Sequence, residues 1–302
     1  MNGSEPKSVS VTHRAQQFTA KVVLADVLTA GFVGFAAAIP ISIIDYSIMA
    51  RVAGTTSSSM RELCNGIRTL ILRPHRFFLP CAENKCAVVF GACFAVYATT
   101  YMASNVTKSY YESHGHSVNS CNLAAGLGGG FLNTVMTMWK DSLILRVLPI
   151  PGQKSGGKPV PWVTRGLFIG RDTLTCLAAF TIAPKVADWL ANYFWNAKES
   201  TKRKQLPPPE GKIHIPMATV DAAQIATPAM LQVVTTAMHI FAIRYHQTYP
   251  LFTHHDFFTS MRETYVTSLL LRITRIIPSF GIGGIVNREM RHGLLERAES
   301  ST

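Results

Sequence analysis

The sequence predicts an all-α membrane protein with six transmembrane helices, arranged in three pseudo-symmetric repeats of two spans plus a connecting amphipathic helix. Three observations support this prediction. Charged residues make up only 15% of the 302 residues, whereas about 25% is usual in a soluble globular protein. Six apolar stretches are long enough to cross a bilayer, and one sequence pattern occurs three times at a nearly constant spacing.

The recurring pattern is a run of small and apolar residues that ends in arginine. Its three copies occupy residues 30–51, 125–146 and 223–244. When the copies are aligned, small, hydroxyl and cationic residues fall in shared columns: Ala30, Ala125 and Ala223; Ser42, Thr137 and Thr235; Arg51, Arg146 and Arg244. Self-similarity at a fixed period is typical of a repeated architecture, and here it indicates three copies of one helical hairpin.

The candidate spans each have the roughly 18 or more apolar residues that are needed to cross a bilayer. They lie at residues 22–45, 86–105, 121–139, 167–194, 221–243 and 264–287. The alternative is that they are buried helices of a soluble core, but six of them in a regular row favour a membrane protein.

Within each repeat a polar connector with a basic amphipathic stretch joins the two spans. The clearest is at residues 60–78, where Leu63 and Ile67 fall on one face, as expected for a helix that lies on the membrane surface. Similar pieces occur at residues 253–264 and, more weakly, at 158–166.

The whole chain, residues 1–302, is predicted to form a single membrane domain. Its parts are repeat one at about 22–110, repeat two at about 120–196, a cationic and proline-rich linker at 197–216, and repeat three at about 217–291. Neither a cleavable secretory signal nor a convincing transit peptide is visible. Lys and Arg are divided evenly between the two sets of loops, so the positive-inside rule gives no orientation.

The net charge of +12 raises the question of nucleic acid binding. The basic residues lie in every loop rather than in one stripe, so no nucleic acid partner is expected. Membrane lipids with anionic head groups, such as cardiolipin, fit this distribution better. The six cysteines show neither a disulfide framework nor a zinc-ligand spacing. No metal or other cofactor is expected.

Three repeats of two spans with an interposed amphipathic helix resemble the mitochondrial carrier family. In that family the first span of each repeat bears the signature P-x-[DE]-x-x-[KR], whose proline bends the helix and whose charged pair bridges neighbouring repeats. Here Pro40, Ser42 and Asp45 stand at these positions in repeat one, and Lys140 stands at the last position in repeat two. Only Pro40 and Lys140 match the signature, and Asp45 has the opposite sign to the usual cation.

The resemblance implies a ring of repeats in which Asp45 and Lys140 are neighbours. They would then form one inter-repeat ion pair that acts as a gate. The alternative is a static packing pair in a relative that does not transport.

Small residues precede the signature positions. Gly31 and Gly34 in repeat one, and Gly126 and Gly129 in repeat two, match the spacing at which carrier helices pack closely. Removing side chains lets two backbones approach each other in lipid, where packing replaces the hydrophobic driving force. The glycine-rich run at 126–131 lacks the Lys-Ser/Thr of a phosphate-binding loop, so helix packing is the favoured interpretation.

The second spans of repeats two and three carry a more specific match. Arg171 and Asp172 lie in the fourth span, and Arg275 lies in the sixth, three residues before the helix-bending Pro278. In carriers an arginine at these points faces the central cavity at substrate depth, and an Arg-acid pair in the fourth span is typical of amino-acid transporters. The resemblance therefore implies that Arg171, Asp172 and Arg275 bind substrate.

The chemistry of these residues suits a zwitterion. An arginine in hydrocarbon costs about 3 kcal/mol on insertion scales, so it faces the interior of a bundle or a watery cavity. A guanidinium group binds a carboxylate or a phosphate through two parallel hydrogen bonds, and Asp172 can accept an ammonium group. Alternatively, Asp172 is structural and neutralises Arg272 or Lys140.

These observations predict a monomeric, multi-pass transporter of the mitochondrial inner membrane. It would move a small anionic or zwitterionic metabolite, such as an amino acid, by alternating access. The alternative is a carrier-derived protein that no longer transports and serves as a membrane scaffold, insertase or accessory subunit. Eroded signatures favour the alternative, whereas the intramembrane arginines favour transport. The sequence shows no arrangement typical of an enzyme.

Overall fold

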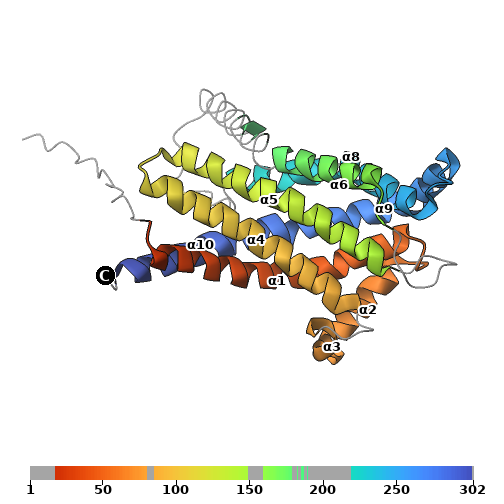
Figure 1. Cartoon of the computed structure of the whole chain (residues 1–302), viewed down its shortest axis with the longest axis horizontal. Helices are drawn as coiled ribbons and strands as arrows, with labels where there is room; N and C mark the ends of the chain where they lie inside the picture. Colours follow the sequence, from red (N-terminus) through yellow and green to blue (C-terminus); the bar gives the residue numbers. More distant parts are fainter. Residues whose placement is uncertain are drawn as a thin grey trace, which may run out of the picture.

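The computed structural model describes residues 18–79, 85–148, 159–178 and 219–300, together with residues 182, 185, 186 and 189. Every regular element in these ranges is a helix. The long helices lie side by side along the long axis of the molecule (Figure 1). The linker predicted at 197–216 lies outside the described residues.

Helix α1 (Ala20–Val52) contains 33 residues, almost all of them apolar or small. At 1.5 Å per residue it is about 50 Å long, more than the roughly 30 Å of a bilayer's hydrocarbon core. The helix continues through Pro40, which has no N–H to donate to the preceding turn. It buries two carboxylates, Asp26 and Asp45, near its two ends.

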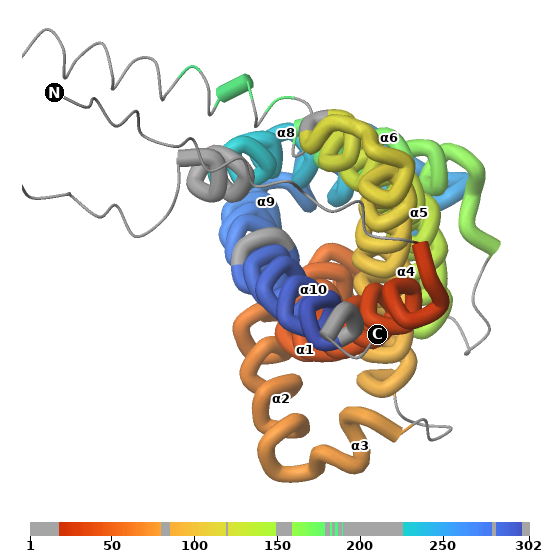
Figure 2. The backbone as a smooth tube through the Cα atoms, turned by 90° about the vertical axis from the view of Figure 1, so that its left-hand side faces the viewer, coloured from red at the N-terminus to blue at the C-terminus, as the bar shows by residue number. Residues whose placement is uncertain are grey.

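The other long helices close into a ring with α1. They are α4 (Lys85–Ser113), α5 (Val118–Val147), α6 (Trp162–Leu177), α8 (Thr219–Thr248) and α9 (His254–Ile276), which runs on through η2 (Ile277–Ile282) into α10 (Gly283–Ser300). Each packs against the next long helix in the chain, and the α9–η2–α10 segment returns to α1. The end-on view shows this closed arrangement (Figure 2). Side chains on the inner faces of the helices therefore share one interior.

Two short helices, α2 (Ser59–Leu72) and α3 (Pro74–Phe78), join α1 to α4 and project from the side of the ring (Figure 2). The side chain of Ser58 accepts a hydrogen bond from the backbone N–H of Arg61, and this N-cap begins α2. The amphipathic segment predicted at 60–78 is thus present as two helical pieces.

The connector predicted at 253–264 is not a separate helix. Thr253 and Asp256 form a capping box, and α9 runs from it without interruption to Ile276. Because the box satisfies N–H groups of the first turn, the helix begins at this point rather than at the apolar stretch. The piece predicted at 158–166 likewise runs into α6.

Four helical segments of the described residues are long and apolar enough to cross a membrane: Ala20–Val52, Lys85–Ser113, Ala226–Thr248 and His254–Arg297. Helix α5 covers the span predicted at 121–139 but is not among them, because glycine and polar residues dilute its apolar character. The span predicted at 167–194 lies partly outside the described residues. The protein is a multi-pass helical membrane protein, and six spans in three repeats are not confirmed.

Glycines of α1 and α5 allow both helices to approach α4 closely. A Cβ atom built on Gly34 would lie 2.6 Å from the backbone nitrogen of Ala98, and one on Gly129 would lie 3.2 Å from a backbone carbonyl oxygen of α4. Gly126 is buried in α5. The close packing predicted for Gly31 is wrong, because a Cβ atom there would meet nothing within 4 Å.

Replacing Gly34 by alanine is expected to lower the free energy of unfolding by about 1–3 kcal/mol. The added methyl group would overlap the backbone of α4, which cannot rotate away as a side chain can. Gly31→Ala is the matched control on the same helix, since that position is open. Thermal unfolding of both variants in detergent measures the difference, and equal melting temperatures would contradict the close approach of α1 and α4.

The α9–η2–α10 segment changes its helical geometry at η2, which has Pro278 at its start. Within η2 the backbone carbonyl of Ser279 accepts a hydrogen bond from the Tyr101 hydroxyl of α4. Prolines and π-turns are established causes of helix bends, and π-turns often mark functional sites. This irregular backbone comes directly after the charged residues Arg272 and Arg275.

Candidate functional site

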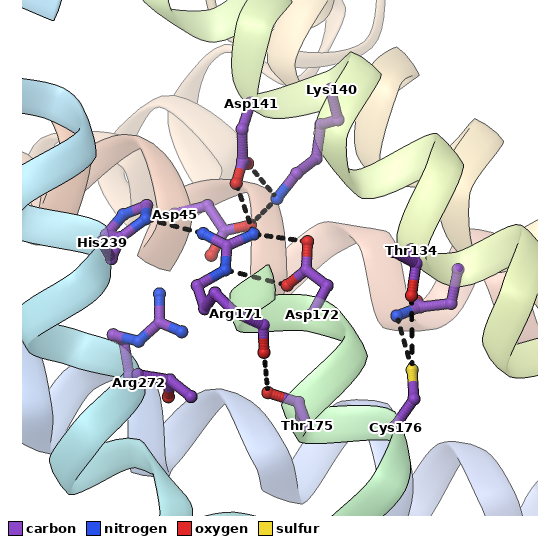
Figure 3. Close-up of polar contacts among 12 residues, drawn as sticks. Asp45, Thr134, Lys140, Asp141, Arg171, Asp172, Thr175, Cys176, His239 and Arg272 are labelled. Atoms are coloured by element: carbon purple, nitrogen blue, oxygen red, sulfur yellow. Dashed lines mark hydrogen bonds and ion pairs between the residues drawn. The ribbon is translucent and has the colours of Figure 1, made fainter. Parts of the chain in front are cut away.

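Seven charged side chains from four helices meet inside the ring, and Figure 3 shows all of them except Arg275. We call them the ionic cluster: Asp45, Lys140, Asp141, Arg171, Asp172, Arg272 and Arg275. All but Arg275 are at most 4% exposed, and the Arg275 side chain is 15% exposed. Buried charges are stable only when they are paired or hydrogen-bonded, so their partners define the site.

Asp45 joins α1 to two other helices. One carboxylate oxygen accepts a hydrogen bond from the Lys140 ammonium group, and the other accepts from Nη1 of Arg275 at 2.7 Å. Lys140 also lies 3.0 Å from Asp141 Oδ1. The two residues that the repeat alignment placed as neighbours, Asp45 and Lys140, therefore form a buried ion pair.

Arg171 uses all three of its guanidinium nitrogens. Nε and Nη2 donate to the two oxygens of Asp172 at 2.8 and 2.7 Å, and Nη2 also lies 2.7 Å from Oδ2 of Asp141. The approach to Asp141 is an ion pair. Asp172 thus forms its ion pair with Arg171. It does not pair with Arg272 or with Lys140, the two partners that the sequence suggested.

The third nitrogen of Arg171, Nη1, lies 2.6 Å from Nδ1 of His239 on α8. An arginine side chain has donors only, so Nδ1 of His239 must be the acceptor and the ring proton must reside on Nε2. Through these contacts Arg171 connects α5, α6 and α8. Each nitrogen of Arg171 therefore already has a partner in this closed arrangement.

Arg272 differs from the other cations of the cluster. Its Nε donates to the side-chain oxygen of Gln232 at 3.0 Å, and no described carboxylate lies within 4.0 Å of it. Figure 3 shows its guanidinium group near Arg171 and His239 and without an ion pair. Arg272 is therefore a buried cation whose hydrogen-bonding partner is neutral.

The ionic cluster as a whole carries four cations and three carboxylates. Its formal charge is consequently positive by one when His239 is neutral, in a region where water is largely excluded. Such a site attracts an anionic group.

A second polar network, which we call the distal cluster, lies toward the opposite end of α1. Arg291 of α10 donates from Nε to Asp26 at 2.8 Å, and from Nη2 to Ser109 at 2.8 Å and to Glu112 at 3.0 Å. Ser109 in turn donates to Asp26. The distal cluster ties α1, α4 and α10 together.

Next to the distal cluster, the amides of Asn105 and Asn287 hydrogen-bond each other reciprocally at 2.9 and 2.8 Å. Asp26 and Asp45 are 19 residues apart on α1, which corresponds to about 28 Å along the helix. The two charged clusters are therefore separated by nearly the thickness of a bilayer's hydrocarbon core.

All five charged residues that the sequence singled out, Arg171, Asp172, Arg275, Asp45 and Lys140, lie in the ionic cluster. The sequence reasoning missed Asp141, Gln232 and His239, and the Asp26 partner of Arg291 in the distal cluster, and it considered Arg272 only as an ion-pair partner of Asp172. Some signals were available. Arg272 is one helical turn from Arg275, Asp141 follows Lys140 directly, and Asp26 is an acidic residue within an apolar stretch.

No set of three His, Cys, Asp or Glu side chains is placed to hold a metal ion in the described part of the chain.

Ionisable residues that are buried among membrane-crossing helices typically mark substrate or ion pathways. The ring and its ionic cluster therefore define a multi-pass membrane protein of the transport class. Within that class, residues 29–295 match the family model described as probable citrulline exporter, and the chain belongs to this family. The chain matches no curated protein and no solved structure.

The resemblance to the mitochondrial carrier family is wrong, since the matching family is that of the probable citrulline exporters. Its supporting features were glycines that let helices approach, amphipathic connectors and intramembrane arginines. The physics of lipid imposes such features on many helical bundles. The mitochondrial inner-membrane location depended on that resemblance and has no other support, and the assignment as a multi-pass membrane protein remains.

Proposed function

We propose that this protein exports citrulline, or a neutral amino acid that resembles it, across a membrane. Two findings support the proposal: membership of the probable citrulline exporter family, and the ionic cluster inside the ring. The ionic cluster is the observation that carries the proposal. It offers guanidinium groups for an α-carboxylate and carboxylates for an α-ammonium group, which are the two charges of a zwitterionic amino acid.

The structure corresponds to a closed state in which the three carboxylates of the ionic cluster are paired with Lys140, Arg171 and Arg275. In the proposed cycle, the substrate carboxylate binds a guanidinium group of the ionic cluster, and the substrate ammonium group replaces a cation beside Asp172. Exchanging one ion pair for another avoids leaving a charge unpaired in a dry interior. Substrate binding thereby loosens the links that close the cluster.

The ionic cluster and the distal cluster suit alternating access, which needs a closure on each side of the substrate. The ionic cluster joins α1 to α5 and α9, and α5 to α6, whereas the distal cluster joins α1 to α4 and α10. In the proposed mechanism, opening of one cluster while the other stays closed exposes the site to one side of the membrane at a time. The irregular η2 segment, which lies between Arg275 and Arg291, is the proposed point of bending.

Helices α2 and α3 are proposed to rest on anionic lipid head groups. Ile71 and Leu72 are 69% and 64% exposed, and three exposed arginines lie close to them in the sequence: Arg68, Arg73 and Arg76. Apolar side chains beside cationic ones are typical of segments that lie in the interface of a membrane with negatively charged lipids.

Counterflow in proteoliposomes tests the transport proposal. Vesicles that contain the purified full-length protein are loaded with unlabelled citrulline and diluted into trace radiolabelled citrulline. The expected result is transient accumulation of label above that in protein-free vesicles. The exchange experiment does not depend on which way the protein is inserted.

Failure of folded protein to exchange any amino acid from a broad panel would contradict the proposal, and would favour a membrane protein that does not transport. Exchange of another neutral amino acid in place of citrulline would keep the transport mechanism and correct the substrate.

A further inference from the structure

We infer that Arg272 is the residue that receives the substrate carboxylate, and that the surplus positive charge around it excludes amino acids with a cationic side chain. This inference rests on the proposed function and makes it specific. It assigns the recognition to a residue that no carboxylate of the described residues pairs with in the closed state, rather than to Arg171 or Arg275.

The contacts of Arg272 leave two donor atoms available. Nε is occupied by Gln232, and no described residue accepts a hydrogen bond from Nη1 or Nη2. The side chain is only 2% exposed, so bulk water does not solvate it as it would a surface arginine. A buried guanidinium group without an anionic partner is costly, and this cost favours binding of an anionic group.

Gln232 holds Arg272 in a defined orientation. Its side-chain oxygen accepts from both Arg272 Nε and Thr235 Oγ1, and its side-chain nitrogen donates to the backbone carbonyl of Pro228. These contacts fix which end of the amide faces the arginine. The guanidinium group is therefore positioned to present Nη1 and Nη2 together, and these two atoms match the two oxygens of a carboxylate.

The charges around Arg272 determine which side chains the site tolerates. Its charged neighbours are Arg171, Arg275, Asp172 and Asp45. Both carboxylates are already paired with arginines, and His239 is hydrogen-bonded to Arg171 in a neutral form. A zwitterion adds a negative group that relieves the repulsion among the arginines and a positive group that Asp172 can accept. A second positive charge, as in arginine or ornithine, has no further free carboxylate in the ionic cluster. The ureido group of citrulline is neutral and avoids this repulsion.

Arg272→Gln tests the inference, with Arg262→Gln as the matched control on the exposed face of α9. Losing charge-assisted hydrogen bonds to the carboxylate is expected to raise the transport KM for citrulline about 10- to 100-fold. Without ligand, Arg272→Gln should be at least as stable to heat as the wild type, because it removes a buried cation that has no carboxylate partner. The control should keep the wild-type KM.

Two ligand experiments on the wild-type protein test the inference without the Arg272→Gln variant. Citrulline amide, which lacks the carboxylate, should neither compete in counterflow nor raise the melting temperature. Arginine and ornithine should compete about tenfold or more less effectively than citrulline, owing to the repulsion between like charges.

The possible results separate the inference from the proposed function. An unchanged KM in Arg272→Gln, or competition by citrulline amide equal to that of citrulline, overturns the inference and leaves the transport proposal standing. Stabilisation of the wild type by chloride or inorganic phosphate alone, lost in Arg272→Gln without any change in citrulline KM, would assign Arg272 to a structural anion and also overturn it. Equal competition by arginine would overturn the charge selectivity. Lack of any transport by the wild type would instead refute the proposed function.

Discussion

Replacing Arg171 by methionine is expected to lower the free energy of unfolding by about 3–5 kcal/mol, the range for removing one partner of a buried ion pair. Asp172 would lose the only cation that the structure places against it within the described chain, and it is 4% exposed. Asp141 would keep Lys140 alone, and His239 would lose the donor to its Nδ1. The links among α5, α6 and α8 would weaken together. Thermal or denaturant unfolding of the purified protein in lipid–detergent micelles measures the loss.

Two further variants separate charge from packing at this position. Adding Asp172→Asn to Arg171→Met removes the uncompensated carboxylate, so a large part of the lost stability should return. Arg146→Met, at an exposed arginine of α5, should change the stability by no more than about 0.5 kcal/mol. A loss in Arg171→Met no greater than that in the control would show that the ionic cluster does not hold the helices together.

Arg291→Met is expected to lower the free energy of unfolding by about 3 kcal/mol. Asp26 has no exposed surface, and among the described residues it would keep only the hydroxyl of Ser109 as a side-chain partner. The reverse change, Asp26→Asn, should cost clearly less. Arg291 would still donate to Ser109 and Glu112, and Glu112 is partly exposed to solvent. The two variants differ in stability because of burial: leaving the more deeply buried charge without its partner destabilises the protein more.

The same unfolding assay distinguishes the two variants at the distal cluster. Combining Asp26→Asn with Arg291→Met should recover stability relative to Arg291→Met alone, because no buried charge is then left unpaired. Equal losses in the two single variants would indicate that packing, and not the ion pair, joins α1 to α10.

Much of the helical framework could be predicted, because hydrophobic length is a local property of the sequence. The spans predicted at 22–45 and 86–105 lie inside α1 and α4. Helix boundaries were less predictable. The start of α9 at His254 depends on the capping box of Thr253, which outweighed the interpretation of 253–264 as a separate surface helix.

The site was predictable in part. Charges within apolar stretches, such as Arg171 and Asp45, can be recognised in the sequence as functional candidates, because a charge in lipid is energetically unfavourable. Their partners cannot be recognised in this way. Arg171 pairs with its neighbour Asp172, with Asp141 of α5 and with His239 of α8. Nothing in a linear pattern distinguishes an arginine that is paired with carboxylates, such as Arg171, from Arg272, which has the neutral partner Gln232. That difference decides which arginine is available to a substrate.

The sequence by itself determined that this chain is helical, that it crosses a membrane several times, and that it buries charge while doing so. Segment length and apolar composition decide these properties one helix at a time. Only the tertiary structure decided how the charges are shared, because ring closure brings residues as distant as Asp45 and Arg275, or Asp26 and Arg291, within hydrogen-bonding distance. The strength of a buried charge pair depends on distance and on exclusion of water, and both are properties of the packed ring.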